Sequence, residues 1–338
     1  MPLIAAGTAR LSPVEFILAA DAPLTHVRVR DGKVHIRVRA GVYAEREVWD
    51  RLKPWDRYLA RVHAFALVHP GAIFSHESAA VLLGMPIFGE PLDIHVYDPG
   101  RKRSRRFGDV CVHTSRDARE IEVRGALRTT TAVQTAVDLM RVLPPAFALA
   151  VGCAAISPAQ GGAASIDDLR AVALGEANAR GRAQLTELWS LLDPRIESPG
   201  EAVSLAVMRW VGFADPELQV VVASEGYRDR VDFGWRRVMA LGESDGYEKY
   251  RGETAEEAVK RIIDEKRREE RLRRSCRAFD RWDMAAALGV TVLTERLDGM
   301  AVPRVRSPRP GLLATLSSNP RSIPVPRNQK PAEKPRTA

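Results

Sequence analysis

Carboxylates gather in one short stretch of the chain. Asp232 lies in the run Arg-Val-Asp-Phe-Gly-Trp that ends at Trp235, and Glu243 and Asp245 follow closely. Carboxylates at this density repel one another unless a cation lies among them, and Mg²⁺ or Mn²⁺ prefers oxygen ligands of this kind. The stretch therefore predicts a metal site open to water and a substrate phosphate. The alternative is a set of solvated acids beside a turn, for which Asp245-Gly246 is a common dipeptide.

Two neighbouring strands should position these acids. Apolar residues alternate with Asp232 and Gly234 at the two-residue period of a strand, and a second apolar run, 238–241, follows at hairpin distance. With a turn near 236–237, Asp232 would lie within a few residues of Glu243 and Asp245 on the next strand. A charged helix should then run from about 254 to 274.

The same region carries five separated motifs in order. They are Ser198-Pro-Gly-Glu201, which should open a helix, Pro216-Glu-Leu-Gln219, Arg230-Val-Asp-Phe233, Gly242-Glu-Ser-Asp-Gly246 with Lys249-Tyr250, and Glu265-Lys-Arg-Arg-Glu269. Together, over about 184–298, they resemble the restriction-endonuclease-like domain related to very-short-patch-repair (Vsr) nucleases, of the PD-(D/E)XK superfamily. The resemblance implies a small mixed sheet flanked by helices, and phosphodiester hydrolysis in DNA with Mg²⁺ or Mn²⁺.

The resemblance also implies roles for single residues. Asp232 and Glu243 would hold the metal, with Glu201 as a third acid on the first helix. The superfamily places a lysine two residues after the second acid, but this chain has Asp245 there. Lys249 or Lys266 would then supply the missing cation. The alternative is a DNA-binding regulator or antitoxin that retains a non-cleaving nuclease fold.

Residues 36–86 carry a second group of motifs. Arg37-Val-Arg-Ala-Gly-Val-Tyr43 precedes Phe74-Ser-His-Glu-Ser-Ala-Ala80. Both resemble the AbiEi-type antitoxin and transcriptional-regulator family, which implies an N-terminal winged helix-turn-helix, DNA as a partner, and a cognate toxin or methyltransferase as a further candidate partner. Ser75 has the position of a helix N-cap, where its hydroxyl would accept an orphan backbone N–H. His76 is then expected to be a hydrogen-bonded structural residue.

Two groups of basic side chains could contact DNA phosphates. Arg37 and Arg39 lie on a predicted hairpin, and a Pro-Gly turn carries Arg101, Lys102, Arg103, Arg105 and Arg106. Such side chains can bind a nucleic-acid backbone, but exposed loops also carry them for solubility.

Charge and composition bound these interpretations. The formal net charge is +8, but residues 303–338 hold eight Lys or Arg and one Glu, so the tail is +7 and the remainder near +1. The Pro-rich tail, 301–338, is predicted to be disordered. All seven histidines precede residue 114, which excludes histidine from the nuclease-like region.

The expected organisation is mixed α+β. A winged-helix-like region (1–50) precedes an α/β region (51–160), a linker with a helix (161–183), the nuclease-like domain (184–300) and the tail. Three widely separated cysteines favour neither disulfides nor zinc ribbons. With no signal peptide and no apolar run long enough to span a bilayer, the sequence predicts a cytoplasmic protein without a membrane segment.

Overall fold

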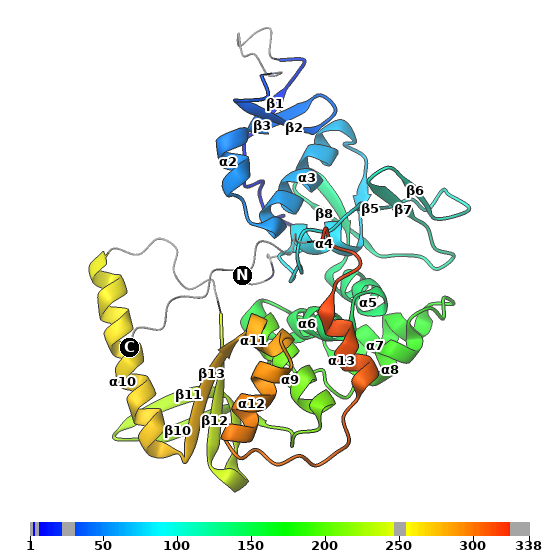
Figure 1. Cartoon of the computed structure of the whole chain (residues 1–338). Coiled ribbons are helices and arrows are strands. Elements are labelled where there is room, and N and C mark those ends of the chain that lie inside the picture. Colours follow the sequence, from blue (N-terminus) through cyan, green and yellow to red (C-terminus); the bar gives the residue numbers. More distant parts are fainter. Residues whose placement is uncertain (1–2, 4–6, 22–30, 247–254, 325–338) are drawn as a thin grey trace.

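The computed structural model describes residues 3, 7–21, 31–246 and 255–324. Within them the protein has mixed α+β structure, as predicted, with three β-sheets of three, six and four strands (Figure 1). No helix in these ranges is long and apolar enough to cross a membrane.

The N-terminal sheet has the order β1-β3-β2. Its elements are β1 (Ile17–Leu18), β2 (His35–Arg39), β3 (Val42–Glu45) and the short helix α2 (Arg46–Arg51). Strand β1 pairs with β3 in antiparallel fashion, with Ile17 opposite Tyr43. Residues 22–30 lie outside the described residues.

The six-stranded sheet has the order β6-β7-β5-β4-β9-β8. The strands are β4 (Ile73–Phe74), β5 (Ile94–Tyr97), β6 (Arg105–Phe107), β7 (Val110–His113), β8 (Ile121–Arg124) and β9 (Leu127–Thr130). The helices of this region are α3 (Pro54–Val68), α4 (His76–Leu83), α5 (Ala132–Val142) and α6 (Pro145–Ile156). Thr131 caps α5 by accepting a hydrogen bond from the Gln134 N–H.

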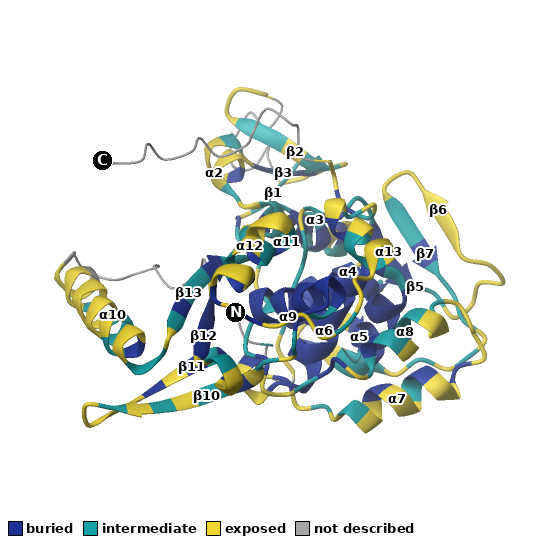
Figure 2. Cartoon of the chain, turned by 60° about the horizontal axis from the view of Figure 1, so that its bottom comes forward, coloured by how far each residue is buried: buried dark blue, intermediate teal, exposed yellow. Residues whose placement is uncertain are grey.

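Helix α6 lies at the centre of the molecule. All of its residues are buried, which explains why this Ala-rich helix has no polar face (Figure 2). It packs against α5 on one side and against α9 (Pro199–Val211) from the C-terminal half. One hydrophobic cluster therefore extends through both halves of the chain.

The predicted linker is packed against this core. Gly161 has φ +77°, and a Cβ atom on Gly162 would lie 2.4 Å from the Ala154 carbonyl oxygen. Glycine at 162 therefore permits a close contact with the end of α6. The elements that follow are η1 (Pro158–Gln160), α7 (Ile166–Gly175) and α8 (Arg182–Leu188).

The four-stranded sheet has the order β10-β11-β12-β13. Its strands are β10 (Glu217–Ser224), β11 (Tyr227–Trp235), β12 (Ala240–Asp245) and β13 (Ala278–Asp283), with η2 (Arg236–Val238) at the predicted turn. The first three strands are antiparallel, and β13 joins parallel to β12 after α10 (Ala255–Ser275). The sheet is therefore mixed, and both α9 and α10 contact it.

Helix α9 packs on this sheet through aromatic residues. The rings of Phe233 and Trp282 stack at 5.7 Å, and Trp282 Nε1 donates to Ser204 Oγ on α9 at 2.8 Å. A Cβ atom on Gly242 would lie 2.4 Å from Trp282 Cη2, so the ring occupies the space that a side chain would need. Trp282 thus links Ser204 of α9 to strands β11 and β13 of the sheet.

The C-terminal segment contradicts part of the predicted disorder. After α11 (Met284–Leu288) and α12 (Thr291–Gly299), the chain forms α13 (Pro310–Ala314) and η3 (Thr315–Ser317). Bridges join Arg304 to Phe213 and Ser322 to Pro91. Ordered structure thus continues to Pro324. Backbone pairing and ion pairs hold this segment in place, although its Pro-rich composition predicts disorder. Residues 325–338 lie outside the described part.

Candidate functional site

The first turn of α9 positions Glu201. Ser198 Oγ accepts a hydrogen bond from the Glu201 N–H at 3.1 Å, which confirms that Ser198 opens the helix. The Glu201 carboxylate turns back and accepts from the Glu197 N–H at 2.9 Å. Glu201 is only 4% exposed, and the positive end of the helix dipole favours a negative charge there.

Asp232 reaches the same place from strand β11. Its Oδ2 atom accepts from the Ser244 N–H at 2.8 Å, so β12 holds the carboxylate in one orientation. Gln219 Nε2 lies 3.0 Å from Glu201 Oε2 and 3.5 Å from Asp232 Oδ1. One amide group therefore contacts two carboxylates, and the structure brings Glu201 and Asp232 together.

Gln219 has an unusual backbone. It lies opposite Asp232, between the paired positions Leu218↔Phe233 and Val220↔Val231, and its φ of +54° is in the left-handed region. Residues other than glycine rarely adopt this conformation, and such strain is concentrated at functional sites. The motif around Gln219 was visible in the sequence, but its contact with both acids was not.

Asp232 affects the ionisation of Glu201. Burial and then the negative charge of Asp232 raise the pKa of Glu201 from 4.5 to about 7. Hydrogen bonds with Glu197 and Ser198 oppose this rise in the pKa. Two carboxylates that share a buried site in this way are stabilised by a proton or a metal cation.

The Glu243 side chain points away from the Glu201–Asp232 pair. It forms ion pairs with Arg268 of α10 and, at 3.6 Å, with Arg281 of β13. The next residue, Ser244, lies on the opposite side of the strand, where its Oγ would be 2.7 Å from a Cβ atom on Gly200 of α9. The structure thus places the Glu243 carboxylate toward α10 and the Glu201–Asp232 pair toward α9.

Asp245 is also neutralised by an arginine. Its Oδ1 atom accepts from Arg281 Nε at 3.0 Å, and Arg281 further contacts Glu265 of α10. These contacts make a network of acidic and basic side chains on the α10 side of the sheet.

Lys249 and Lys266 are the lysines predicted to supply a cation near the acids. Lys249 lies outside the described residues, and Lys266 is exposed on α10. The cation that pairs with Glu243 is Arg268, four residues before the buried Leu272 and thus on the same helix face. In the sequence, the four-residue spacing between Arg268 and the apolar Leu272 is the signal that would have identified this arginine.

The predicted DNA-binding residues are distributed over two surfaces. Arg37 is exposed on β2, whereas Arg39 pairs with Asp109 at 3.1 Å and lies over the Phe65 ring. The loop before β6 and the first residues of β6 are exposed, and together they carry all five predicted cations: Arg101, Lys102, Arg103, Arg105 and Arg106. Arg101 pairs with Asp98 and Arg106 with Asp93.

The donor set at Glu201 and Asp232 fits a divalent cation. Among the described residues no group of three or more His, Cys, Asp and Glu side chains is arranged around one point. Mg²⁺ does not need such a group, because it commonly takes one or two carboxylates and keeps several waters. The buried Glu201 carboxylate, the half-buried Asp232 carboxylate and the adjacent amide of Gln219 satisfy this requirement.

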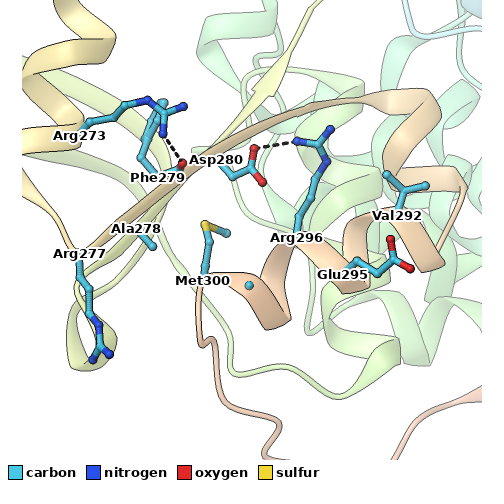
Figure 3. Close-up of a pocket in the computed structure, with 10 residues that line it drawn as sticks. Arg273, Arg277, Ala278, Phe279, Asp280, Val292, Glu295, Arg296 and Met300 are labelled. Atoms are coloured by element: carbon cyan, nitrogen blue, oxygen red, sulfur yellow. Dashed lines mark hydrogen bonds and ion pairs between the residues drawn. The ribbon is translucent and has the colours of Figure 1, made fainter. Parts of the chain in front are cut away.

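A separate hollow of about 660 Å³ lies beside β13 and α12 (Figure 3). Arg296 Nη1 donates to Asp280 across it at 2.7 Å, and Arg273 Nη1 donates to the Phe279 carbonyl oxygen at 3.1 Å. Arg277 extends away from this group in the close-up view. Because its charges are mixed and several are paired, the hollow is not a second acidic site.

No protein-family model, curated protein or solved structure matches this chain.

Proposed function

We propose that the protein is a DNA-binding, Mg²⁺- or Mn²⁺-dependent endonuclease with a Vsr-like centre at Glu201 and Asp232. The observation that carries the proposal is the contact of these two carboxylates, one buried and one half-buried, through Gln219, together with the raised pKa of Glu201. Mutual repulsion of this kind is relieved when a cation binds. The order of helix α9, strands β10–β12, helix α10 and strand β13 supports the same proposal.

In this proposal each side chain has a defined part. Asp232 and Glu201 would hold the ion, and a bound divalent cation would polarise the phosphoryl oxygen and lower the pKa of its water. The Ser244 N–H fixes the orientation of Asp232, and Gln219 keeps the two carboxylates together. Glu243 would become a ligand only if its ion pair with Arg268 opened.

Exposed cations would hold the DNA. Positive charge on the N-terminal half comes from the loop Arg101–Arg106 and from Arg37. This half resembles AbiEi-type proteins, which are DNA-binding regulators. Arg39 is less suited to this role, because its guanidinium already contacts Asp109. Lys266, exposed on α10, remains a further candidate beside the nuclease-like sheet.

The second candidate is a regulator or antitoxin with an inactive nuclease fold. The observation that favours it is Asp245, which stands at the lysine position and is bound to Arg281. Such a protein would bind DNA without metal and would associate with a cognate toxin or methyltransferase.

A plasmid assay separates the two candidates. Supercoiled DNA is incubated with wild-type protein and with Asp232→Ala, each with Mg²⁺, with Mn²⁺ and with EDTA. Glu225→Gln is the matched control, because Glu225 is an exposed acid of the same sheet that pairs with Arg274. Metal-dependent cleavage by the wild type and the control, but not by Asp232→Ala, supports the endonuclease. DNA binding without cleavage in any metal supports the regulator.

A further inference from the structure

A second polar site lies in the N-terminal half, outside the nuclease-like sheet. His95 Nδ1 lies 2.8 Å from His113 Nε2, and His95 Nε2 lies 3.2 Å from a carboxylate oxygen of Glu77. The ring of His76 stacks on that of His113 with centroids 4.0 Å apart. Three histidines and a buried acid therefore form one connected group on α4, β5 and β7.

This group is built under strain. His76 is the first residue of α4 and has φ +47°, which only a few percent of non-glycine residues adopt. Ser75 occupies the N-cap position, but its hydroxyl lies 3.2 Å from His76 Nδ1 and does not cap the helix, so the predicted capping bond is absent. The strained backbone and the Ser75 contact both orient the His76 ring.

The group opens into a pocket of about 530 Å³. The residues that line it include two histidines and four arginines: His76, His113, Arg119, Arg141, Arg180 and Arg321. Arg321 comes from the C-terminal segment that follows η3, and it completes the wall by pairing with Glu77. The pocket is thus assembled from residues that lie far apart in the sequence.

Positive charge exceeds negative charge around this pocket. Three of its arginines are paired with acids: Arg321 with Glu77, Arg119 with Asp138 at 2.5 Å, and Arg141 with Glu176 at 3.2 Å. Arg180 is exposed at the rim, and its guanidinium makes no ion pair or hydrogen bond within the described residues. A ligand that complements this wall carries negative charge.

A metal ion does not fit the same residues. The facing nitrogens of His95 and His113 are occupied with each other, and no metal-binding group of three side chains is present in the described chain. Guanidinium groups favour planar recognition of phosphate and carboxylate oxygens instead. Since small-molecule sites commonly enclose 300–1,000 Å³ in rough terms, the volume suits a ligand larger than a bare phosphate.

We propose that this pocket binds a small phosphomonoester of mononucleotide size, with its phosphate at Arg180 and beside the His76–His113 stack. The proposal is independent of DNA cleavage, because it uses no residue of the nuclease-like sheet. It gives the C-terminal segment a role, since Arg321 both closes the pocket and links it to Glu77.

Calorimetric titration of the full chain tests the proposal. The probes are a nucleoside 5′-monophosphate, the same nucleoside without phosphate, and inorganic phosphate. We expect the monophosphate to bind more tightly than either of the others. Arg180→Glu should weaken that binding by at least about tenfold, the scale of a lost charged hydrogen bond. The matched control is Arg228→Glu, an exposed arginine on β11, which should bind as the wild type does.

Histidine NMR signals provide a second measurement that does not depend on a variant folding. Addition of the monophosphate should shift the ring signals of His76 and His113 and leave that of the exposed His69 unchanged. Equal binding of nucleoside and monophosphate, equal affinities in Arg180→Glu and Arg228→Glu, or unmoved His76 and His113 signals would each overturn the proposal. If inorganic phosphate bound as tightly as the monophosphate, the inference that the ligand is of nucleotide size would be overturned.

Discussion

Arg321 forms a two-point ion pair with Glu77, 244 positions earlier in the chain. The Glu77 side chain is 4% exposed and that of Arg321 is 23% exposed. This pair and the bridge from Ser322 to Pro91 attach the C-terminal segment to the N-terminal half. The attachment is a tertiary feature that the composition of the segment does not reveal.

Removal of this arginine should destabilise the protein. In Arg321→Ala the buried Glu77 loses its ion-pair partner, and we expect the free energy of unfolding to fall by about 3 kcal/mol. The control is Arg309→Ala, whose exposed pair with Glu187 should contribute less than about 1 kcal/mol. Denaturant unfolding measures both, and equal small losses in the two variants would contradict the expected role of Arg321.

Acid should weaken the same region. Burial opposes ionisation of Glu77, but His95 and Arg321 outweigh it and lower the pKa from 4.5 to about 2. A carboxyl with a lowered folded pKa contributes stability above its unfolded pKa and loses it as the pH falls. We therefore expect the contribution of Glu77 to be lost between about pH 4.5 and 2. Glu77→Gln should show a smaller loss than the wild type over this window in urea titrations.

Glu201 should have the opposite pH dependence. Its pKa is raised to about 7, so the folded state holds a proton that the unfolded state releases near 4.5. The stabilisation is complete below 4.5 and is lost as the pH rises through about 7.

The difference between wild type and Glu201→Gln isolates this effect. Asp138, whose pKa burial raises to about 6, titrates in the same direction but is present in both proteins. We expect the wild type to lose more stability than Glu201→Gln between pH 5 and 8 without metal. Addition of Mg²⁺ at pH 8 should restore the stability of the wild type but not that of the variant. Parallel pH profiles would show that Glu201 does not titrate in this range.

Metal binding should distinguish Asp232 from Glu243. Because Glu243 is held by Arg268, Glu243→Gln should retain a calorimetric Mn²⁺ binding signal, whereas Asp232→Asn should lose it. Loss of binding in both variants would instead make Glu243 a metal ligand that leaves Arg268 when the ion enters.

The basic loop should contribute to DNA affinity without sequence preference. Replacement of Arg101, Lys102, Arg103, Arg105 and Arg106 by glutamine should weaken binding to unrelated duplexes by a similar factor. The slope of log K against log salt should decrease by about 0.9 for each phosphate contact removed. Fluorescence anisotropy across a salt series measures the slope, and an unchanged slope would exclude the loop from the interface.

Gly242 should not tolerate a side chain. A Cβ atom would lie 2.4 Å and 2.8 Å from two atoms of the Trp282 ring, which is fully buried against Phe233. Gly242→Ala should therefore cost about 1–3 kcal/mol through overpacking. Gly246→Ala, where the corresponding position is open, should cost little in the same thermal unfolding measurement. A neutral Gly242→Ala would mean that β12 and Trp282 can separate.

Local patterns in the sequence were sufficient to predict secondary-structure elements of the region 184–300. Alternating apolar residues predicted β11, the serine at 198 predicted the start of α9, and the turn at 236–237 was found as η2. These features depend on neighbouring residues, which is why they can be read from a linear chain. The presence of Glu201, Asp232 and Glu243 as candidate acids followed from the same motifs.

Which acids come together was decided by the tertiary structure. Strand alternation directs Glu243 toward Arg268 on α10, whereas Gln219 from β10 lies between Glu201 and Asp232. The sequence alone determined the mixed α+β composition and the acidic residues of the candidate site. Only packing of α9 and α10 on the sheet, and of the C-terminal segment against Glu77, determined their partners, because burial and charge pairing depend on contacts between residues far apart in the chain.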